Sequence, residues 1–181
     1  MDRIHLISRL IDGAMLQELF THKGVGCMIS RGSLWTFRSA EIDDVGGILQ
    51  LIEPLGNEGV LAGRDRKLIE IEIDQFLVLE HDNMIIGCAA LNHFLGTNIG
   101  ELTCLAIHSD YRNKGCGDSL FRHIKMRAKR LGIKKLIVLT TKASHWFTER
   151  GFNEISVEDL PKIKQGKYNY KRRSKIFIRN I

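Results

Sequence analysis

A basic, glycine-bearing turn is the stretch whose residue types and spacing best suit chemistry on a charged ligand. It reads Tyr-Arg-Asn-Lys-Gly-Cys-Gly at residues 111–117, after an apolar segment at 101–108 and directly before an amphipathic segment. The first turn of a helix has unpaired backbone N–H groups and a partial positive charge, and glycines let an anion approach the backbone. The spacing predicts a phosphate-binding turn, although the pattern alone also fits an ordinary strand-to-helix connection.

The turn lacks the features of two widespread nucleotide-binding motifs. It has no Gly-Lys-Ser/Thr ending, which a P-loop requires, and it is too short for the dinucleotide fingerprint. The net charge of +6 favours an anionic partner: nucleic acid, a phosphorylated cofactor or an acidic small molecule. The aromatic residues are few and are not interleaved with basic ones, as stacking on single strands requires, so nucleic acid is not the expected partner.

Cysteine spacing and hydropathy argue against a metal site, a disulfide framework and a membrane or secreted protein. The four cysteines, at positions 27, 88, 104 and 116, include no C-x-x-C pair and have no histidine at zinc-ligand spacing, so we expect no metal and no disulfide framework. No apolar run is long enough to cross a bilayer, and the first residues lack the apolar region of a secretory signal. We expect a cytoplasmic protein with free thiols and no membrane partner.

Hydrophobic spacing predicts the elements that would position the turn. Apolar stripes predict helices at about 43–54, 65–74, 118–131 and 144–150. Apolar runs predict strands at 76–80, 84–91, 101–108, 134–141 and 176–178, the first two joined by a tight turn at Asp82 and Asn83. A right-handed crossover would make the third and fourth strands parallel. The predicted fold class is mixed α/β (α+β), with the order β-β-β-α-β-α-β around a central mixed sheet flanked by helices.

The first 32 residues form a separate stretch of sequence. A short helical pattern places Ile11, Met15, Leu16 and Leu19 on one side, and a segment broken by glycines follows it. We therefore expect an attachment at 1–32 and a main domain at 33–181.

The turn resembles the pyrophosphate-binding motif of the GNAT acetyltransferase superfamily, Gln/Arg-x-x-Gly-x-Gly/Ala. Other segments, E-I-D-Q-F, C-A-A-L, G-E-L-T-C-L-A-I-H, L-T-T-K-A-S-H-W-F-T-E-R-G-F and Y-N-Y-K-R-R-S-K, are similar to the acetyltransferase domains of bacterial N-acetylglutamate synthases. The resemblance implies a GNAT-like fold from about residue 38 onward and acetyl-coenzyme A as cofactor. Residues 4–30 look like the closing segment of the amino-acid-kinase-like domain that precedes the acetyltransferase domain in those enzymes.

The resemblance also implies where the cofactor lies. Its pyrophosphate would bind the backbone N–H groups of the turn, and its pantetheine arm would run beside the strand at 101–108, toward a gap between that strand and residues 136–141. The cofactor-binding residues would be Cys104, Leu105, Ile107, Arg112, Asn113, Lys114, Gly115, Cys116 and Gly117.

Acetyl transfer to an amine requires removal of a proton from the amine and protonation or screening of the departing thiolate. Glu101 is the candidate general base, directly or through water, and Thr140 could relay a proton to the sulfur. Both also fit structural interpretations, because a carboxylate at a strand end is often only solvated and threonine favours the β conformation. The region in which many GNAT enzymes have a tyrosine reads His145-Trp146-Phe147, so no tyrosine acid is expected there.

Arginines are the candidates for recognising an acidic substrate. A guanidinium binds a carboxylate through two hydrogen bonds, and L-glutamate offers two carboxylates. The resemblance implies that Arg64, Arg66, Arg172, Arg173 and Ser174 bind it, although the C-terminal basic stretch alone also fits a solvated patch. The expected reaction is acetylation of the α-amino group of L-glutamate, toward arginine, by direct attack in a ternary complex. Transfer to another amino acid or a polyamine, and a non-catalytic coenzyme A-binding module, stay open, as does a homo-oligomer.

Overall fold

The computed structural model describes residues 3–21, 24–30 and 35–181, which belong to two compact units divided between Thr36 and Phe37. The domain boundary predicted between residues 32 and 33 lies outside the described residues. Each unit is considered by itself.

The described residues of the first unit form a two-stranded antiparallel sheet and one helix. Strand β1 (Arg3–Leu6) pairs with β2 (Cys27–Ser30), and helix α1 (Ala14–Phe20) lies between them in sequence. The Glu18 carboxylate lies 2.6 Å from His5 Nδ1 and accepts hydrogen bonds from the N–H groups of Val25 and Gly26. Ala14 is the one hydrophobic residue of the described part of this unit that is buried, and the predicted apolar stripe is exposed.

The second unit is built around a seven-stranded sheet with the order β3-β4-β5-β6-β7-β9-β8. Neighbouring strands from β4 to β8 are antiparallel except for β6 and β7, which are parallel. The strands are β3 (Thr36–Ser39), β4 (Phe76–His81), β5 (Met84–His93), β6 (Ile99–Ile107), β7 (Lys135–Thr140), β8 (Asn153–Ile155) and β9 (Lys175–Asn180).

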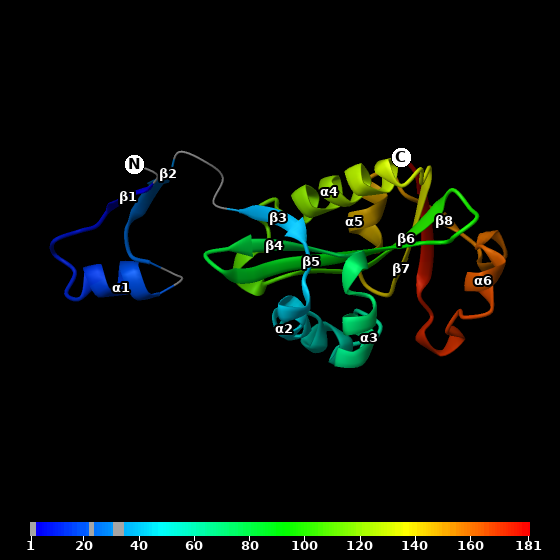
Figure 1. The fold of residues 1–181 in the computed structure, drawn as a ribbon, viewed down its shortest axis with the longest axis horizontal. Helices are drawn as coiled ribbons and strands as arrows, with labels where there is room; N and C mark the ends of the chain where they lie inside the picture. Colours follow the sequence, from blue (N-terminus) through cyan, green and yellow to red (C-terminus); the bar gives the residue numbers. More distant parts are fainter. Residues whose placement is uncertain (1–2, 22–23, 31–34) are drawn as a thin grey trace. The chain divides into compact units, whose positions relative to one another are not determined.

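Helices cover both faces of this sheet. Figure 1 shows α2 (Val45–Asn57) and α3 (Arg66–Ile71) on one face, and α4 (Cys116–Arg130) and α5 (Ser144–Glu149) on the other. The remaining helical segments are α6 (Lys162–Gln165) and five 3-10 turns at Ile42–Asp44, Ile73–Gln75, Ser109–Tyr111, Val157–Asp159 and Tyr170–Arg172. A core of α2 side chains packed on β4, β5 and β6 includes Val45, Ile48, Val78, Cys88 and Ala106.

The predicted mixed α/β class is confirmed, and so are the hairpin and the parallel pair. Asp82 and Asn83 both adopt left-handed backbone angles, with φ of 47° and 61°, as a tight hairpin turn requires. The predicted helix ends were partly wrong. Helix α2 continues through Pro54 to Asn57. Helix α4 begins at Cys116 and ends at Arg130, so Leu131 lies beyond its end and is 49% exposed.

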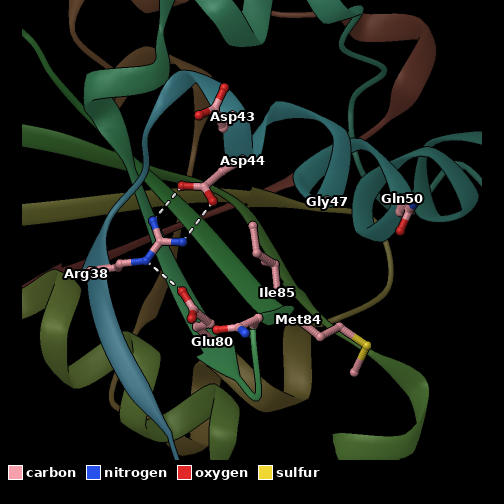
Figure 2. A pocket seen from close by; sticks show the side chains of 9 residues that line it. Arg38, Asp43, Asp44, Gly47, Gln50, Glu80, Met84 and Ile85 are labelled. Carbon is pink, nitrogen blue, oxygen red and sulfur yellow. Dashed lines mark hydrogen bonds and ion pairs between the residues drawn. The ribbon is translucent and has the colours of Figure 1, made fainter. Parts of the chain in front are cut away.

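An arginine-centred cluster connects the edge strand β3 to the rest of this unit (Figure 2). Arg38 donates two hydrogen bonds to Asp44, at 2.6 and 2.8 Å, and a third to Glu80 at 2.7 Å. The bidentate bond from Arg38 holds the pKa of the Asp44 carboxyl below its usual range, and the same bond raises the pKa of Arg38. These contacts fix the start of α2 against β4.

Candidate active site

The parallel strands β6 and β7 separate part-way along their length. They pair from Ile99 with Lys135 to Glu101 with Ile137, and beyond this point β6 continues to Ile107 and β7 to Thr140. A cavity of about 430 Å³ lies at the separation, lined by β6, the end of β7, α5, the start of α4 and the segment after α2. The lining residues that matter below are Glu58, Val60, Thr103, Arg112, Gly117, Thr140 and Trp146.

A β-bulge in β6 opens this strand toward the cavity. Cys88 pairs with Ala106 and Ala90 pairs with Thr103, so two residues, Cys104 and Leu105, lie opposite one residue of β5. Cys104 has φ of 51°, the left-handed angle that glycine usually adopts in one type of bulge. All residues from Leu102 to Ile107 line the cavity, whereas a regular strand would present alternate ones. The backbone edge of β6 beyond Glu101 is therefore available to an extended ligand.

The glycine turn lies at the mouth of the cavity. Asn113 and Gly115 have left-handed φ values of 60° and 77°, and α4 starts immediately after Gly115. Arg112, before these residues, is extended, so the chain reverses through a turn, and successive N–H groups in a turn can form an anion-binding concavity. Arg112 and Gly117 line the cavity, and the Arg112 Nε donates to the Ile107 carbonyl at 3.2 Å.

The predicted cofactor residues differ in their placement. Cys104, Leu105 and Ile107 line the cavity with Arg112 and Gly117, whereas Asn113, Lys114 and Gly115 form the exposed outer part of the turn. The Cys116 side chain is buried, which raises the pKa of its thiol, so only its backbone can face a ligand.

Glu101 lies at the point where the two strands separate. It is 4% exposed, and its carboxylate is 2.6 Å from Lys164 Nζ on α6. Glu101 does not itself line the cavity. Lys164 was missed by the sequence reasoning, because an ion pair between residues so distant in sequence has no local signal.

Thr140 is held where a proton donor could act. It ends β7, is 5% exposed and lines the cavity, and its Oγ1 accepts a hydrogen bond from the Ala143 N–H at 2.9 Å. With this acceptor position occupied, the O–H remains as a donor.

Two of the predicted arginines contact residues of the cavity wall. Arg64 forms an ion pair with Glu72 and donates to the Thr103 hydroxyl at 3.4 Å. Arg172 donates to the Val60 carbonyl at 2.7 Å, and burial lowers its pKa. Among the carboxylates that the structure describes, none lies within ion-pair distance of Arg172, so an incoming anion would supply its missing counter-charge.

The other predicted substrate residues are less closely associated with the cavity. Arg66 is exposed on α3 and pairs with Glu70 of the same helix at 2.7 Å. Arg173 is exposed, with a left-handed φ of 51°. Ser174 is buried, and its carbonyl accepts the Tyr168 hydroxyl at 2.6 Å. These residues remain predictions as ligands.

In the part of the chain that the structure describes, no group of histidine, cysteine and acidic residues could hold a metal ion. Within the same described residues, no helix is long and apolar enough to span a membrane. The described cysteines are free, with Cys27 exposed and Cys88, Cys104 and Cys116 buried.

A mixed sheet that splits between two parallel strands, beside a glycine turn that opens a helix, defines a class of acyl-coenzyme A-dependent transferase folds. Residues 72–154 match the family described as "Acetyltransferase (GNAT) domain". This chain therefore contains a GNAT acetyltransferase domain, as the turn motif predicted.

Two curated proteins match nearly the whole chain. The chain is 51% identical over 179 residues to the amino-acid acetyltransferase of Aeromonas salmonicida, covering 99% of this chain and 40% of that protein. It is 49% identical to the amino-acid acetyltransferase of Buchnera aphidicola, covering 99% of this chain and 41% of that protein. The chain thus spans about 40% of the length of the curated relatives it matches.

Two solved structures also match nearly the whole chain. N-acetylglutamate synthase from Neisseria gonorrhoeae, in complex with coenzyme A and L-arginine, matches with a TM-score of 0.87 and 36% identity over 100% of this chain and 41% of that chain. The same enzyme with coenzyme A and N-acetyl-glutamate matches with a TM-score of 0.79 and 37% identity over 99% of this chain and 43% of that chain.

Proposed function

We propose that this chain transfers the acetyl group of acetyl-coenzyme A to the α-amino group of L-glutamate, giving N-acetyl-L-glutamate. The observation that carries the proposal is the cavity between β6 and β7, with the glycine turn at its mouth and Arg64 and Arg172 against its wall. The relatives named amino-acid acetyltransferase, and the gonococcal synthase solved with coenzyme A and N-acetyl-glutamate, support it.

The residues of the cavity fit acetyl-coenzyme A. The N–H groups of the turn and of the first turn of α4 would hold the pyrophosphate, because residues 112–115 are exposed and the start of α4 carries the positive end of the helix dipole. The backbone edge of β6 at the bulge would bind the pantetheine arm in the way that a sheet edge binds an added strand. When bound, the cofactor supplies an acetyl group activated as a thioester.

The proton transfers follow from the side chains at the two ends of the strand separation. Glu101 accepts a proton from the substrate ammonium, and it does so through a water because it lies outside the cavity lining. The free amine then attacks the thioester carbonyl, so an N–C bond forms and the C–S bond breaks. The Thr140 hydroxyl donates a proton to the departing sulfur and regains one from solvent or the product amine.

Arg172 and Arg64 are the groups that would recognise the two carboxylates of the acceptor. A half-buried guanidinium bonded to a carbonyl is incompletely compensated, and a carboxylate would supply both charge and hydrogen-bond acceptors. Arg64 already shares its charge with Glu72, so we assign the stronger contribution to Arg172.

The cellular setting is part of the proposal. We infer a cytoplasmic role in the first step toward arginine, and we assign residues 1–32 to a segment that resembles the end of an amino-acid-kinase-like domain. The support is the family resemblance and the match of nearly the whole chain, these residues included, to the relatives named amino-acid acetyltransferase.

A panel of acceptors tests the function. The purified chain is incubated with acetyl-coenzyme A and glutamate, glutamine, aspartate, ornithine or spermidine, and the release of free thiol is measured. We expect glutamate to give the highest kcat/KM. A higher value with another acceptor would favour the broader amine acetyltransferase, and coenzyme A binding by calorimetry without turnover would favour a non-catalytic module.

A further inference from the structure

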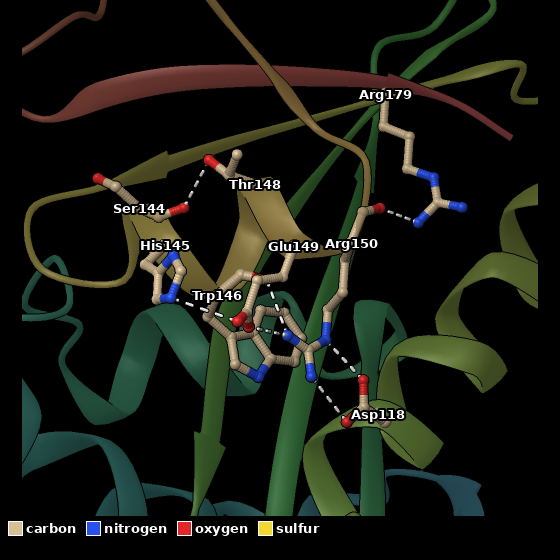
Figure 3. Close-up of polar contacts among 8 residues, drawn as sticks. All are labelled: Asp118, Ser144, His145, Trp146, Thr148, Glu149, Arg150 and Arg179. Atoms are coloured by element: carbon tan, nitrogen blue, oxygen red, sulfur yellow. Dashed lines mark hydrogen bonds and ion pairs between the residues drawn. The ribbon is translucent and has the colours of Figure 1, made fainter.

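Arg150 connects the start of α4 to α5 through a set of contacts that the mechanism above does not use (Figure 3). Its guanidinium forms a bidentate ion pair with Asp118 on α4, at 2.5 and 2.8 Å. The same group lies 3.8 Å from the centroid of the Trp146 ring and donates to the Trp146 carbonyl at 2.8 Å. Arg179 on β9 donates in turn to the Arg150 carbonyl.

Trp146 forms the side of the cavity mouth that faces the glycine turn. It lines the cavity, and its ring would lie 3.5 Å from a Cβ atom placed on Gly117. A guanidinium stacks on this ring as a cation–π contact, and the indole also packs edge-on against the rings of Phe121 and Phe147, with centroid distances of 6.1 and 4.9 Å. Arg150 is therefore the charged member of the contacts that position Trp146 beside the turn.

Arg150 also forms an ion pair with Asp118. This carboxylate lies in the first turn of α4, directly after Gly117, at the helix end proposed to hold a pyrophosphate. The hydrogen bond from Arg150 lowers the pKa of Asp118, so the carboxylate stays ionised near neutral pH. An unpaired negative charge there would repel the cofactor and compete for the same N–H groups.

We propose that Arg150 is a positioning residue for the acyl-coenzyme A: it neutralises Asp118 beside the phosphate-binding turn and fixes Trp146 as the cofactor-contacting wall. This inference rests on the proposed cofactor, but not on glutamate being the acceptor. It assigns a function to a charge pair outside the reacting centre.

Calorimetric titration of coenzyme A into three variants tests the inference. Arg150→Met removes the ion pair of Asp118 and the cation–π contact on Trp146, so we expect affinity to fall on the order of tenfold, the size of one charge interaction near a protein surface. Asp118→Asn keeps the stacked guanidinium and removes the negative charge, so its affinity should stay within about threefold of wild type. The double variant should recover part of the loss, because the repulsion is gone.

Salt and fluorescence separate positioning from a purely structural role. The defect of Arg150→Met should shrink at high salt because screening weakens charge repulsion. In a Trp35→Phe background, Trp146 is the only remaining tryptophan of the two in the sequence, and coenzyme A should change its emission. Glu154→Gln, which breaks the exposed pair with Lys175 at 3.0 Å, is the matched control and should bind as wild type.

The outcomes are distinct. If the wild-type chain binds no coenzyme A, the proposed function fails. If the wild type binds it but folded Arg150→Met binds equally well at low salt, the inference alone is overturned. A lower melting temperature with unchanged affinity in the folded protein also overturns it, because Arg150 would then only stabilise the fold.

Discussion

Glu101 sits at the last position where β6 pairs with β7, is 4% exposed, and has its carboxylate 2.6 Å from Lys164 Nζ. A carboxylate with so little access to water needs a counter-charge, and Lys164 supplies it from another part of the chain. The ion pair places the proposed base at the point where β6 and β7 separate. Because Lys164 lies on α6, the charge balance of the buried Glu101 carboxylate depends on the position of α6.

Replacing Glu101 with glutamine should remove proton abstraction while preserving the side-chain shape. We expect kcat to fall by about 10²- to 10⁴-fold, the usual contribution of a general base. Coenzyme A affinity by calorimetry should stay unchanged, because Glu101 lies outside the cavity lining. A kcat within a few-fold of wild type in the folded variant would reject Glu101 as the base.

Replacing Lys164 with methionine should destabilise the protein through the partner it leaves behind. Breaking a fully buried ion pair costs about 3–5 kcal/mol, and we expect about 2 kcal/mol here because the Lys164 side chain is 21% exposed. Urea denaturation measures the loss. The double variant Glu101→Gln/Lys164→Met should recover most of it, and a double variant as unstable as the single one would contradict this reasoning.

Replacing Arg172 with methionine should selectively weaken binding of the amino-acid acceptor. Losing a hydrogen bond to a charged group costs about 1.5–3 kcal/mol, so we expect the KM for glutamate to rise about 10- to 100-fold with little change in the KM for acetyl-coenzyme A. Arg130→Met, which removes an exposed cation at the end of α4, is the control. Equal effects on both KM values would indicate a structural role for Arg172.

The glycine turn is an element whose backbone, more than its side chains, determines the site. Gly115 has φ of 77°, and no atom lies within 4 Å of a Cβ placed there, so an alanine would be strained by the backbone angle alone. We expect Gly115→Ala to cost about 1–2 kcal/mol and to weaken coenzyme A binding, since the turn must then relax.

Gly46→Ala provides the opposite case in the same protein. Gly46 lies in α2 with open space around its Cβ position and no left-handed φ, so alanine should stabilise the protein by about 0.5–1 kcal/mol. Denaturation and calorimetry on both variants test the pair. If Gly115→Ala bound coenzyme A like Gly46→Ala, the turn would not be the phosphate site.

Elements defined by local signals were predictable from the sequence. The Asp82-Asn83 hairpin and the glycine-opened helix α4 depend on residues adjacent in the chain. Strands β3 and β8 were missed because they are four and three residues long and are stabilised by their partners. The bulge at Cys104 was also missed, since a cysteine with a left-handed angle has no sequence signature.

The candidate site was only partly accessible to the same reasoning. The turn motif located Arg112 and Gly117 at the cavity, because this ligand geometry is local. The contacts of Lys164 with Glu101 and of Arg172 with Val60 depend on how distant segments pack. The sequence shows that lysines and arginines are present, but it does not show where the fold places them.

The whole molecule should lose stability in acid. The pKa of Asp44 is lowered in the folded state by Arg38, so this carboxylate stabilises the protein at pH values above its unfolded pKa of about 3.9. The stabilisation is lost as the pH falls from there toward the folded pKa. Arg150 lowers the pKa of Asp118, so protonation of Asp118 in acid also reduces the stability of the protein.

Unfolding free energies measured by urea denaturation between pH 6 and pH 3 test this prediction. Wild type should lose stability across the lower part of this range, and Asp44→Asn should be less stable at pH 6 with a shallower loss toward pH 3. Parallel curves for the two proteins would show that the Arg38–Asp44 pair does not control acid stability.

Acetyl transfer in the cavity between β6 and β7 is most directly tested by product analysis. The chain is incubated with acetyl-coenzyme A and L-glutamate, and coenzyme A and N-acetyl-L-glutamate are quantified by mass spectrometry. We predict one N-acetyl-L-glutamate for each coenzyme A released, and loss of both products in Glu101→Gln while coenzyme A binding is retained. A folded wild-type chain that binds coenzyme A but forms neither product would contradict the proposal.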